Sequence, residues 1–276
     1  MRFGLSIFLT DETIAPDAIA RLAEERGFDS LWLPEHTHMP LDHSPHPSGG
    51  DVPRHYLRTL DPFVALTAAA AATDTLWLGF GICLITQRDP IVTAKQVATL
   101  DRLSGGRVLF GVGAGWNRRE VEHHGTPFER RFGVMRERVE AMRALWTEDV
   151  ASYSGRYVSF GPSWQWPKPI QDPLPVYVGG NREQVLDRVL RYGDHWLPNR
   201  EWDLATRIAE LRRRAGELGK ARPDVTYFGA DIDPATVERL ADGGVDRVLL
   251  RLPSARQEEV EDALGRAAEI AAPMMT

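Results

Sequence analysis

Short apolar segments alternate with longer segments whose apolar residues recur every three or four positions. The short segments are typical of buried strands, and the longer ones are typical of helices with one buried face. The longest predicted helix shows the second pattern through Phe132, Met135, Val139, Met142 and Trp146. The predicted strands are Phe3–Leu9, Ser30–Pro34, Leu76–Ile82, Val108–Val112, Val176–Val178, His195–Leu197, Val225–Phe228 and Arg247–Leu250. The other predicted helices are Pro16–Arg26, Pro62–Ala72, Val92–Leu103, Arg182–Tyr192, Leu204–Leu218, Ala235–Ala241 and Gln257–Ile270.

This alternation predicts a single α/β domain over residues 1–276. Strand-then-helix units follow one another without a linker or a shift in composition, and such a pattern favours a closed (β/α)8 TIM barrel. A chain of this length commonly forms such a barrel as one domain. An open, doubly wound sheet is the alternative.

Two segments interrupt the alternation, at about 36–60 and 152–175. The first is rich in proline, histidine and glycine, and the second is rich in tryptophan and proline. Long loops in a compact barrel are usually lids or binding loops, and the active sites of such barrels lie at the carboxyl ends of the strands. We therefore expect both segments to lie close to the functional site.

Composition limits the possible partners and the compartment. The chain has 33 basic and 39 acidic residues and a net charge of −6, so it offers no basic surface for nucleic acid or an anionic membrane. It has one cysteine, Cys83, which excludes an internal disulfide and fits a reducing compartment. The first residues show no cleavage signal, and no apolar run is long enough to span a membrane. We expect a cytoplasmic protein whose partner is a small molecule.

Glycine-rich turns follow two of the predicted strands. In RVLFGVGAGWN, Gly111, Gly113 and Gly115 alternate at the end of an apolar strand, and a glycine has no Cβ to hold a ligand away from the backbone. The dinucleotide fingerprint requires G-x-G-x-x-G after the first strand, so the spacing here does not favour that motif. Gly179, Gly180 and Asn181 stand between a strand and a helix, where they form either a phosphate site or a tight turn.

Three chemistries compete for the strand ends. His36 and His38, with His43 and His46 nearby, suit a metal-dependent hydrolase, but such a site needs further ligands from later strands, where only His195 is a candidate. We therefore expect no metal in the site. Nucleophilic catalysis is not favoured, because Cys83 lies in an apolar strand and no G-x-S-x-G motif occurs.

The third chemistry is redox on a flat, flavin-like ring. Such a ring needs an apolar wall, backbone groups for its polar edge and an anion site for its phosphate. Aromatic residues that could form a wall or a substrate pocket are Phe8, Trp116, Trp164, Trp166 and Trp196.

Four stretches together carry a family resemblance. These are LWLPEHTH, LGFGICLITQRDPIVTAKQ, LSGGRVLFGVGAGWN and PLPVYVGGN. Their order and spacing resemble the luciferase-like monooxygenase family, in particular its branch of deazaflavin oxidoreductases that use coenzyme F420, over roughly Met1 to Pro198. The resemblance implies a (β/α)8 barrel and a possible homodimer.

The resemblance also implies roles for individual residues. His36 would face the reactive carbon of the deazaflavin and the substrate. Glu35 would orient or charge it, or would instead face away and form a structural salt bridge, because adjacent residues of a strand point to opposite faces. Three groups would bind the cofactor: the bulge with a non-prolyl cis peptide (Gly81, Ile82 and Cys83), the loop beside the ring (Gly113, Ala114, Gly115, Trp116 and Asn117) and the phosphate turn (Gly179, Gly180 and Asn181). Arg88 and Lys95 either approach the acidic tail of the cofactor or are ordinary solvated charges, and the second reading is favoured. The substrate pocket would include Phe8, Trp116, Trp166 and Trp196.

The expected function is hydride transfer between coenzyme F420 and a small organic substrate. Some sugar-phosphate dehydrogenases of the family have a glutamate directly after the glycine turn, where this chain has Trp116. That difference favours an apolar or aromatic substrate over a phosphorylated sugar. The alternatives are a reduced-FMN-dependent monooxygenase of the same family and, from another class, the metal-dependent hydrolase.

Overall fold

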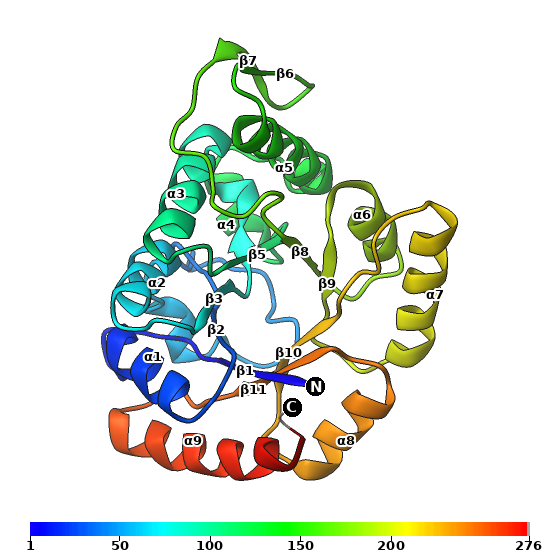
Figure 1. The fold of residues 1–276 in the computed structure, drawn as a ribbon. Helices are drawn as coiled ribbons and strands as arrows, with labels where there is room; N and C mark the ends of the chain where they lie inside the picture. The colour runs from blue at the N-terminus through cyan, green and yellow to red at the C-terminus, as the bar shows by residue number, and fades with distance from the viewer. Residues whose placement is uncertain (275–276) are drawn as a thin grey trace.

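The computed structural model describes residues 1–274, and its centre is a barrel of parallel strands (Figure 1). The barrel strands of the described chain are β1 (Arg2–Ser6), β2 (Ser30–Leu33), β3 (Trp77–Phe80), β5 (Val108–Gly113), β8 (Val176–Gly179), β9 (His195–Leu197), β10 (Thr226–Ala230) and β11 (Arg247–Arg251). They pair in the order β10-β11-β1-β2-β3-β5-β8-β9. A parallel bridge between Trp196 and Val225 joins β9 to β10 and closes the ring. The predicted (β/α)8 barrel is confirmed.

An outer ring of helices covers the barrel. The helices are α1 (Pro16–Glu25), α2 (Pro62–Ala71), α3 (Pro90–Leu103), α4 (Arg118–His123), α5 (Arg131–Thr147), α6 (Val185–Tyr192), α7 (Leu204–Glu217), α8 (Pro234–Asp242) and α9 (Gln257–Ala271). Short 3-10 turns are η1 (Arg54–Leu57), η2 (Ile85–Gln87), η3 (Phe128–Arg130) and η4 (Ala272–Met274). An Asp-Pro pair starts α2, α3 and α8, because the aspartate accepts backbone N–H groups of the first turn and proline suits the first helical position.

Alternate residues of each strand face the inside of the barrel, where they form their own core. Its buried members are Trp32, Leu109, Tyr177, Leu197 and Leu249. The outward residues of the same strands, such as Leu31 and Val108, pack against the helices. The inside is therefore a packed core, and a ligand can only bind above it.

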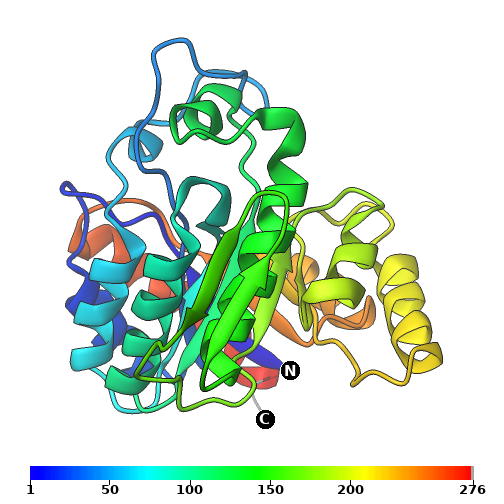
Figure 2. The same cartoon turned by 90° about the horizontal axis from the view of Figure 1, so that it is seen from above.

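The first interrupting segment lies over the carboxyl ends of the strands. It follows β2, and in Figure 2 it rises on the same side as α4 and the start of α5. The backbone N–H of Ser44 donates to Asn117 Oδ1 at 3.1 Å, and Arg200 donates to the carbonyl of Pro47 at 3.1 Å. Residues 36–60 therefore span the mouth of the barrel, as expected; we call them the mouth loop.

The second interrupting segment lies elsewhere, and the expectation that it is a lid or binding loop is wrong. It contains the antiparallel pair β6 (Ala151–Ser154) and β7 (Ser159–Ser163), which extends beyond α5 in Figure 1. The chain then continues along α3, where Gln165 donates to the carbonyl of Ile91 at 3.0 Å and the N–H of Ile170 donates to Asp101 at 2.6 Å. The physical reason is connectivity, because a segment that leads from a helix into a strand starts at the amino end of the barrel.

None of the helices in the described part of the chain combines the length and the apolar character that crossing a membrane requires.

Candidate active site

His36 is held at the end of β2 by a carboxylate from another element. Its imidazole is buried, and Nδ1 lies 3.0 and 3.1 Å from the two carboxylate oxygens of Glu120. Glu120 lies in the first turn of α4 and is completely buried. With Glu120 ionised, Nδ1 carries the proton and donates it in this hydrogen bond, so Nε2 has the lone pair. Within residues 1–274, Nε2 has no hydrogen-bond partner, and it is the nitrogen that can exchange a proton with a ligand.

Glu35 points away from His36, so the expectation that it orients the imidazole is wrong and the alternative, a structural salt bridge, is confirmed. Its carboxylate accepts the N–H of Leu84 at 2.6 Å and Nε of Arg88 at 2.7 Å, and Arg88 also contacts Asp61 at 2.7 Å. Burial alone would lower the pKa of Arg88, but the combined effects of its neighbours, with the Glu35 charge the largest of them, outweigh burial and raise that pKa overall. Neighbouring residues of an extended chain point to opposite sides, which explains why Glu35 braces the turn after β4 (Cys83–Leu84).

The side chains of Arg88 and Lys95 do not reach the mouth of the barrel, where they would have to lie to bind the acidic tail of the cofactor. The guanidinium of Arg88 is held by Glu35 and Asp61 beside α2. The ammonium of Lys95 donates to the carbonyl of Trp166 on the outside of α3.

An aromatic wall stands beside His36. The ring of Tyr56 lies 4.8 Å from the imidazole, and Trp116 meets the imidazole edge-on at 5.8 Å. Phe8 stacks on Tyr56 at 4.5 Å, and His46 lies between Tyr56 and Trp116, at 5.2 and 5.7 Å. Phe8 and Trp116 therefore lie together, as the sequence suggested. Tyr56 was missed, because nothing in the mouth loop's sequence shows which of its side chains turns inward.

The other predicted pocket tryptophans lie outside the mouth. Trp166 is 56% exposed and lies in the segment that runs along α3, with the Lys168 ammonium 5.3 Å from its ring centre. Trp164 is also exposed. Trp196 is fully buried on the outward side of β9, and its indole N–H donates to the carbonyl of Gly180 at 2.8 Å. Placing Trp166 and Trp196 in a pocket is wrong, although Trp196 does support the glycine turn.

Glycines make room for an apolar floor at the mouth. The Gly81-Ile82 peptide is cis, as the resemblance implied. A Cβ on Gly113 would lie 1.8 Å from Ile82 Cδ1, and one on Gly179 would lie 2.9 Å from Ile82 Cγ2. A Cβ on Gly81 would collide with the ring of Phe228 at 2.3 Å. Ile82 and Phe228 rest on the inner core and are partly exposed, so together they form a floor for a ligand.

The remaining predicted cofactor residues stabilise the backbone and loops around this floor. Cys83 is fully buried in the outer core, where burial raises the pKa of its thiol well above the ordinary value. The carbonyl of Ala114 accepts the hydroxyl of Thr86 at 3.1 Å, and Gly115 has a φ of +77°, which favours glycine. Asn117 is buried and anchors the mouth loop through Ser44 and Met39. The side chains of Cys83 and Asn117 are therefore occupied within the protein.

The turn after β8 offers free backbone donors. Gly180 has a φ of +128°, and Arg207 donates to the carbonyls of Asn181 and Arg182 at 2.5 and 2.8 Å. Within the described chain, the N–H groups of Asn181, Arg182 and Glu183 have no acceptor. Because these donors precede α6, where the helix dipole favours negative charge, the turn suits a phosphate.

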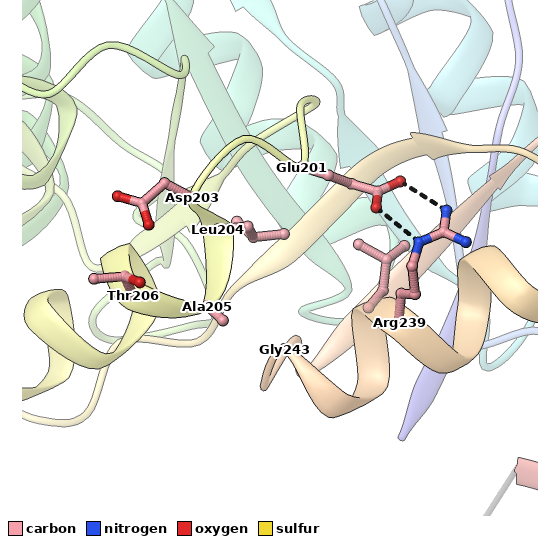
Figure 3. A pocket seen from close by; sticks show the side chains of 8 residues that line it. Glu201, Asp203, Leu204, Ala205, Thr206, Arg239 and Gly243 are labelled. Atoms are coloured by element: carbon pink, nitrogen blue, oxygen red, sulfur yellow. Dashed lines mark hydrogen bonds and ion pairs between the residues drawn. The ribbon is translucent and has the colours of Figure 1, made fainter.

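A cleft on the outer surface is not a candidate for this chemistry. It has a volume of about 310 Å³ and opens between the start of α7 and α8 (Figure 3). Its two main charged groups, Glu201 and Arg239, pair with each other at 3.2 Å. None of the predicted site residues lines it.

The loop histidines do not assemble a metal site in the described chain. His38 Nε2 lies 2.9 Å from His123 Nδ1, but residues 1–274 hold no group of three or more His, Cys, Asp or Glu side chains that could bind a metal. His195 begins β9 and so lies at the amino end of the barrel, opposite the mouth.

The decisive comparison is with a family model. The model of the luciferase-like monooxygenases matches residues 16–246. The chain belongs to the luciferase-like monooxygenase family. Members of this family are F420- or flavin-dependent oxidoreductases and monooxygenases, so this chain is an enzyme of that class.

Relatives of this luciferase-like enzyme include F420-dependent proteins. An uncharacterised protein of Mycobacterium tuberculosis is 42% identical over 260 residues, covering 92% of both chains. An F420-dependent glucose-6-phosphate dehydrogenase of Amycolatopsis mediterranei is 32% identical over 179 residues, covering 63% of this chain and 50% of the relative.

Solved structures share the fold. The monooxygenase RslO1 of Streptomyces bottropensis has a TM-score of 0.83 at 21% identity and covers 99% of both chains. An F420-dependent secondary alcohol dehydrogenase has a TM-score of 0.79 at 20% identity and covers 100% of both chains.

Proposed function

We propose that this luciferase-like enzyme transfers a hydride between coenzyme F420 and a small organic substrate with an apolar or aromatic surface. The observation that carries the proposal is the buried His36–Glu120 pair, which leaves Nε2 of His36 without a partner inside an aromatic wall. The F420-dependent dehydrogenase that is 32% identical supports the deazaflavin over FMN.

The residues at the mouth fit a flat ring with a phosphate handle. Ile82 and Phe228 would support one face of the ring, because the glycines around them leave their side chains at the centre of the mouth. The free N–H groups of Asn181, Arg182 and Glu183 would hold the phosphate. One further polar atom supports a ligand here: the hydroxyl of Ser6 is buried at the carboxyl end of β1 and has no partner within residues 1–274.

His36 is the group that handles the proton. When bound, F420 supplies the ring carbon that donates or accepts the hydride. Oxidation of an alcohol also releases one proton, and Nε2 of His36 accepts it while Glu120 stabilises the resulting imidazolium through Nδ1. In the reverse direction the same nitrogen returns the proton.

The aromatic wall beside His36 determines which class of substrate can bind. Tyr56, Trp116 and Phe8 present rings around His36. The family resemblance implies that Trp116 stands where some sugar-phosphate dehydrogenases have a glutamate. Rings of this kind favour apolar contact over the hydrogen bonds that a phosphorylated sugar requires.

Separate titrations with F420 and FMN test the proposal. The purified enzyme is expected to change the fluorescence of F420 with a Kd in the micromolar range, about −8 kcal/mol, and to leave FMN unbound. Binding of FMN alone would instead support the second candidate, a reduced-FMN-dependent monooxygenase, which the likeness to RslO1 favours. Binding of neither ring would overturn both.

A further inference from the structure

Arginine and phenylalanine side chains alternate in a stack that starts beside Asn117 and ends on α6. The guanidinium carbon of Arg118 lies 4.6 Å from the ring centre of Phe128, and that of Arg131 lies 3.7 Å from the same ring. Arg131 also lies 4.4 Å from the ring centre of Phe132, and Arg188 lies 3.7 Å from it. The stack therefore connects the end of β5 to the helix that follows the Gly180 turn.

Part of this stack carries positive charge without an ion pair among the described residues. Arg118 is paired with Glu122 and Glu129. Arg131, Arg188 and the neighbouring Arg182 make no ion pair within the described chain, because none of them has a carboxylate oxygen within 4.0 Å there. Burial, and then the positive charges of Arg182 and Arg188, lower the pKa of Arg131. The three guanidinium groups therefore repel one another.

The position of these arginines adds to that cost. Arg131 is the first residue of α5, and Arg182 stands in the turn before α6. The amino end of a helix carries partial positive charge, so a cation there is unfavourable. Two unpaired arginines thus stand at helix starts, and a third, Arg188, lies within α6. The ring contacts stabilise the side chains but do not neutralise their charge, whereas a bound anion does.

The stack also leaves hydrogen-bond donors available. A guanidinium that stacks face-on with a ring keeps the N–H groups of its edge free. Among the described residues, the carbonyl of Phe128 is the only acceptor for a side-chain N–H of Arg131, at 2.8 Å, and its Nε is buried without an acceptor. The side chains of Arg182 and Arg188 donate no hydrogen bond within residues 1–274.

We propose that Arg131, Arg182 and Arg188 form the binding site for the carboxylates of the acidic tail of the deazaflavin cofactor. The proposal rests on the proposed function, because Arg182 directly follows the turn whose N–H groups would hold the cofactor phosphate. It also replaces Arg88 and Lys95 in that role, since both of those side chains are occupied elsewhere.

Equilibrium binding of three deazaflavins tests the site. They are F420 with several glutamates in its tail, the form with the phosphate but no glutamate, and the deazariboflavin that lacks both. The wild-type enzyme is expected to bind the glutamate-bearing form about tenfold more tightly than the form without glutamate, as a charge-assisted hydrogen bond would give. That preference should weaken as the salt concentration rises.

Two variants locate the effect. Arg182→Gln and Arg188→Gln should each lose most of the preference for the glutamate tail, and their affinity for deazariboflavin should stay within about twofold of wild type. Arg191→Gln is the matched control, because Arg191 is exposed at the other end of α6 and the substitution removes the same charge. Circular dichroism melting curves confirm that each variant folds.

The outcomes separate this site from the proposed function. Equal affinity of the wild-type enzyme for the two phosphate-bearing forms, with and without glutamates, would overturn the tail site and leave F420 as the cofactor. A preference for the tail that survives in both Arg182→Gln and Arg188→Gln would also overturn it. Binding of FMN with no binding of any deazaflavin would overturn both proposals.

Discussion

At the scale of single residues, the candidate site depends on a pair that the sequence disguises. Asn117 and Glu120 stand in the Asn-x-x-Glu spacing of a helix cap, with Asn117 at the cap position of α4. In the structure neither side chain caps the helix. Asn117 anchors the mouth loop and Glu120 binds His36, so a pattern typical of local structure serves contacts between distant segments. The sequence could identify His36 through its strand end, but not a partner 84 residues away.

The first prediction concerns this pair. His36→Asn should lower kcat by about 10² to 10⁴, the usual contribution of a general acid or base, and should change the F420 affinity little. Glu120→Gln removes the charge that stabilises the imidazolium. It should therefore lower kcat less and move the rise of the kcat/KM profile to lower pH. Steady-state kinetics from pH 5 to 9, with F420 and a substrate of the proposed apolar or aromatic class, would measure both effects.

A control residue distinguishes chemistry from folding. Glu35→Gln removes a buried carboxylate that does not touch His36, so it should destabilise the protein without moving the pH profile. Full turnover by His36→Asn would contradict the proton role. An unmoved profile in Glu120→Gln would contradict the positioning role of that carboxylate.

At the scale of elements, the glycines at the strand ends have a packing role, whereas their spacing suggests a ligand-binding loop. Alternate glycines in β5 resemble a phosphate loop, yet Gly111 and Gly113 face the inside of the barrel and give space to neighbouring strands. A Cβ on Gly111 would lie 2.0 Å from the carbonyl oxygen of Phe80, whereas one on Gly113 would meet a terminal methyl of Ile82. Strand positions were predictable from apolar runs, but the reason for each glycine depends on the register between β3, β4 and β5.

The second prediction follows from that contrast. Both Gly111→Ala and Gly113→Ala should destabilise the protein by about 1–3 kcal/mol, with Gly111→Ala the more severe because a backbone carbonyl cannot rotate away. Gly113→Ala displaces the side chain of Ile82, so it should also weaken F420 binding. Urea unfolding measures the stability, and a fluorescence titration measures the binding.

Two further variants make this prediction specific. Gly161→Ala, in the outer strand β7, is the control because nothing lies within 4 Å of its Cβ position. Ile82→Val removes the methyl that a Cβ on Gly113 would meet. The double variant Gly113→Ala, Ile82→Val should therefore be more stable than Gly113→Ala alone, and an equal or lower stability would rule out this collision as the cause.

At the scale of the whole molecule, the two ends of the barrel have different tasks. The carboxyl end holds the His36–Glu120 pair and the mouth loop, and the amino end is closed by charged groups with structural partners. There Arg247 is almost completely buried and donates to Asp29 at 2.7 Å. The sequence predicted the eight units because each has its own apolar period. The sequence also shows that 152–175 follows a predicted helix, which places this segment at the amino end of the barrel. The lid prediction was wrong because it used the tryptophan content of the segment and not its connectivity.

His195, at the amino end, provides the last prediction, on stability against pH. Its Nδ1 accepts the N–H of Asp224 at 3.0 Å, and its ring lies 4.6 Å from that of Tyr177. Burial lowers the pKa of His195 below its ordinary value of 6.5, against the opposing effect of Asp224 and Asp194. Below pH 6.5, His195 therefore binds a proton more readily in the unfolded chain than in the folded chain, and the free energy of unfolding must fall as the pH decreases through that window.

His195→Asn keeps an acceptor for the Asp224 N–H and removes the titration. Urea unfolding between pH 5 and 7.5 should show a shallower slope for this variant than for wild type. Because His195 lies at the end of the barrel opposite His36, the pH profile of kcat/KM should stay unchanged, and a change in that profile would contradict the separation of the two ends.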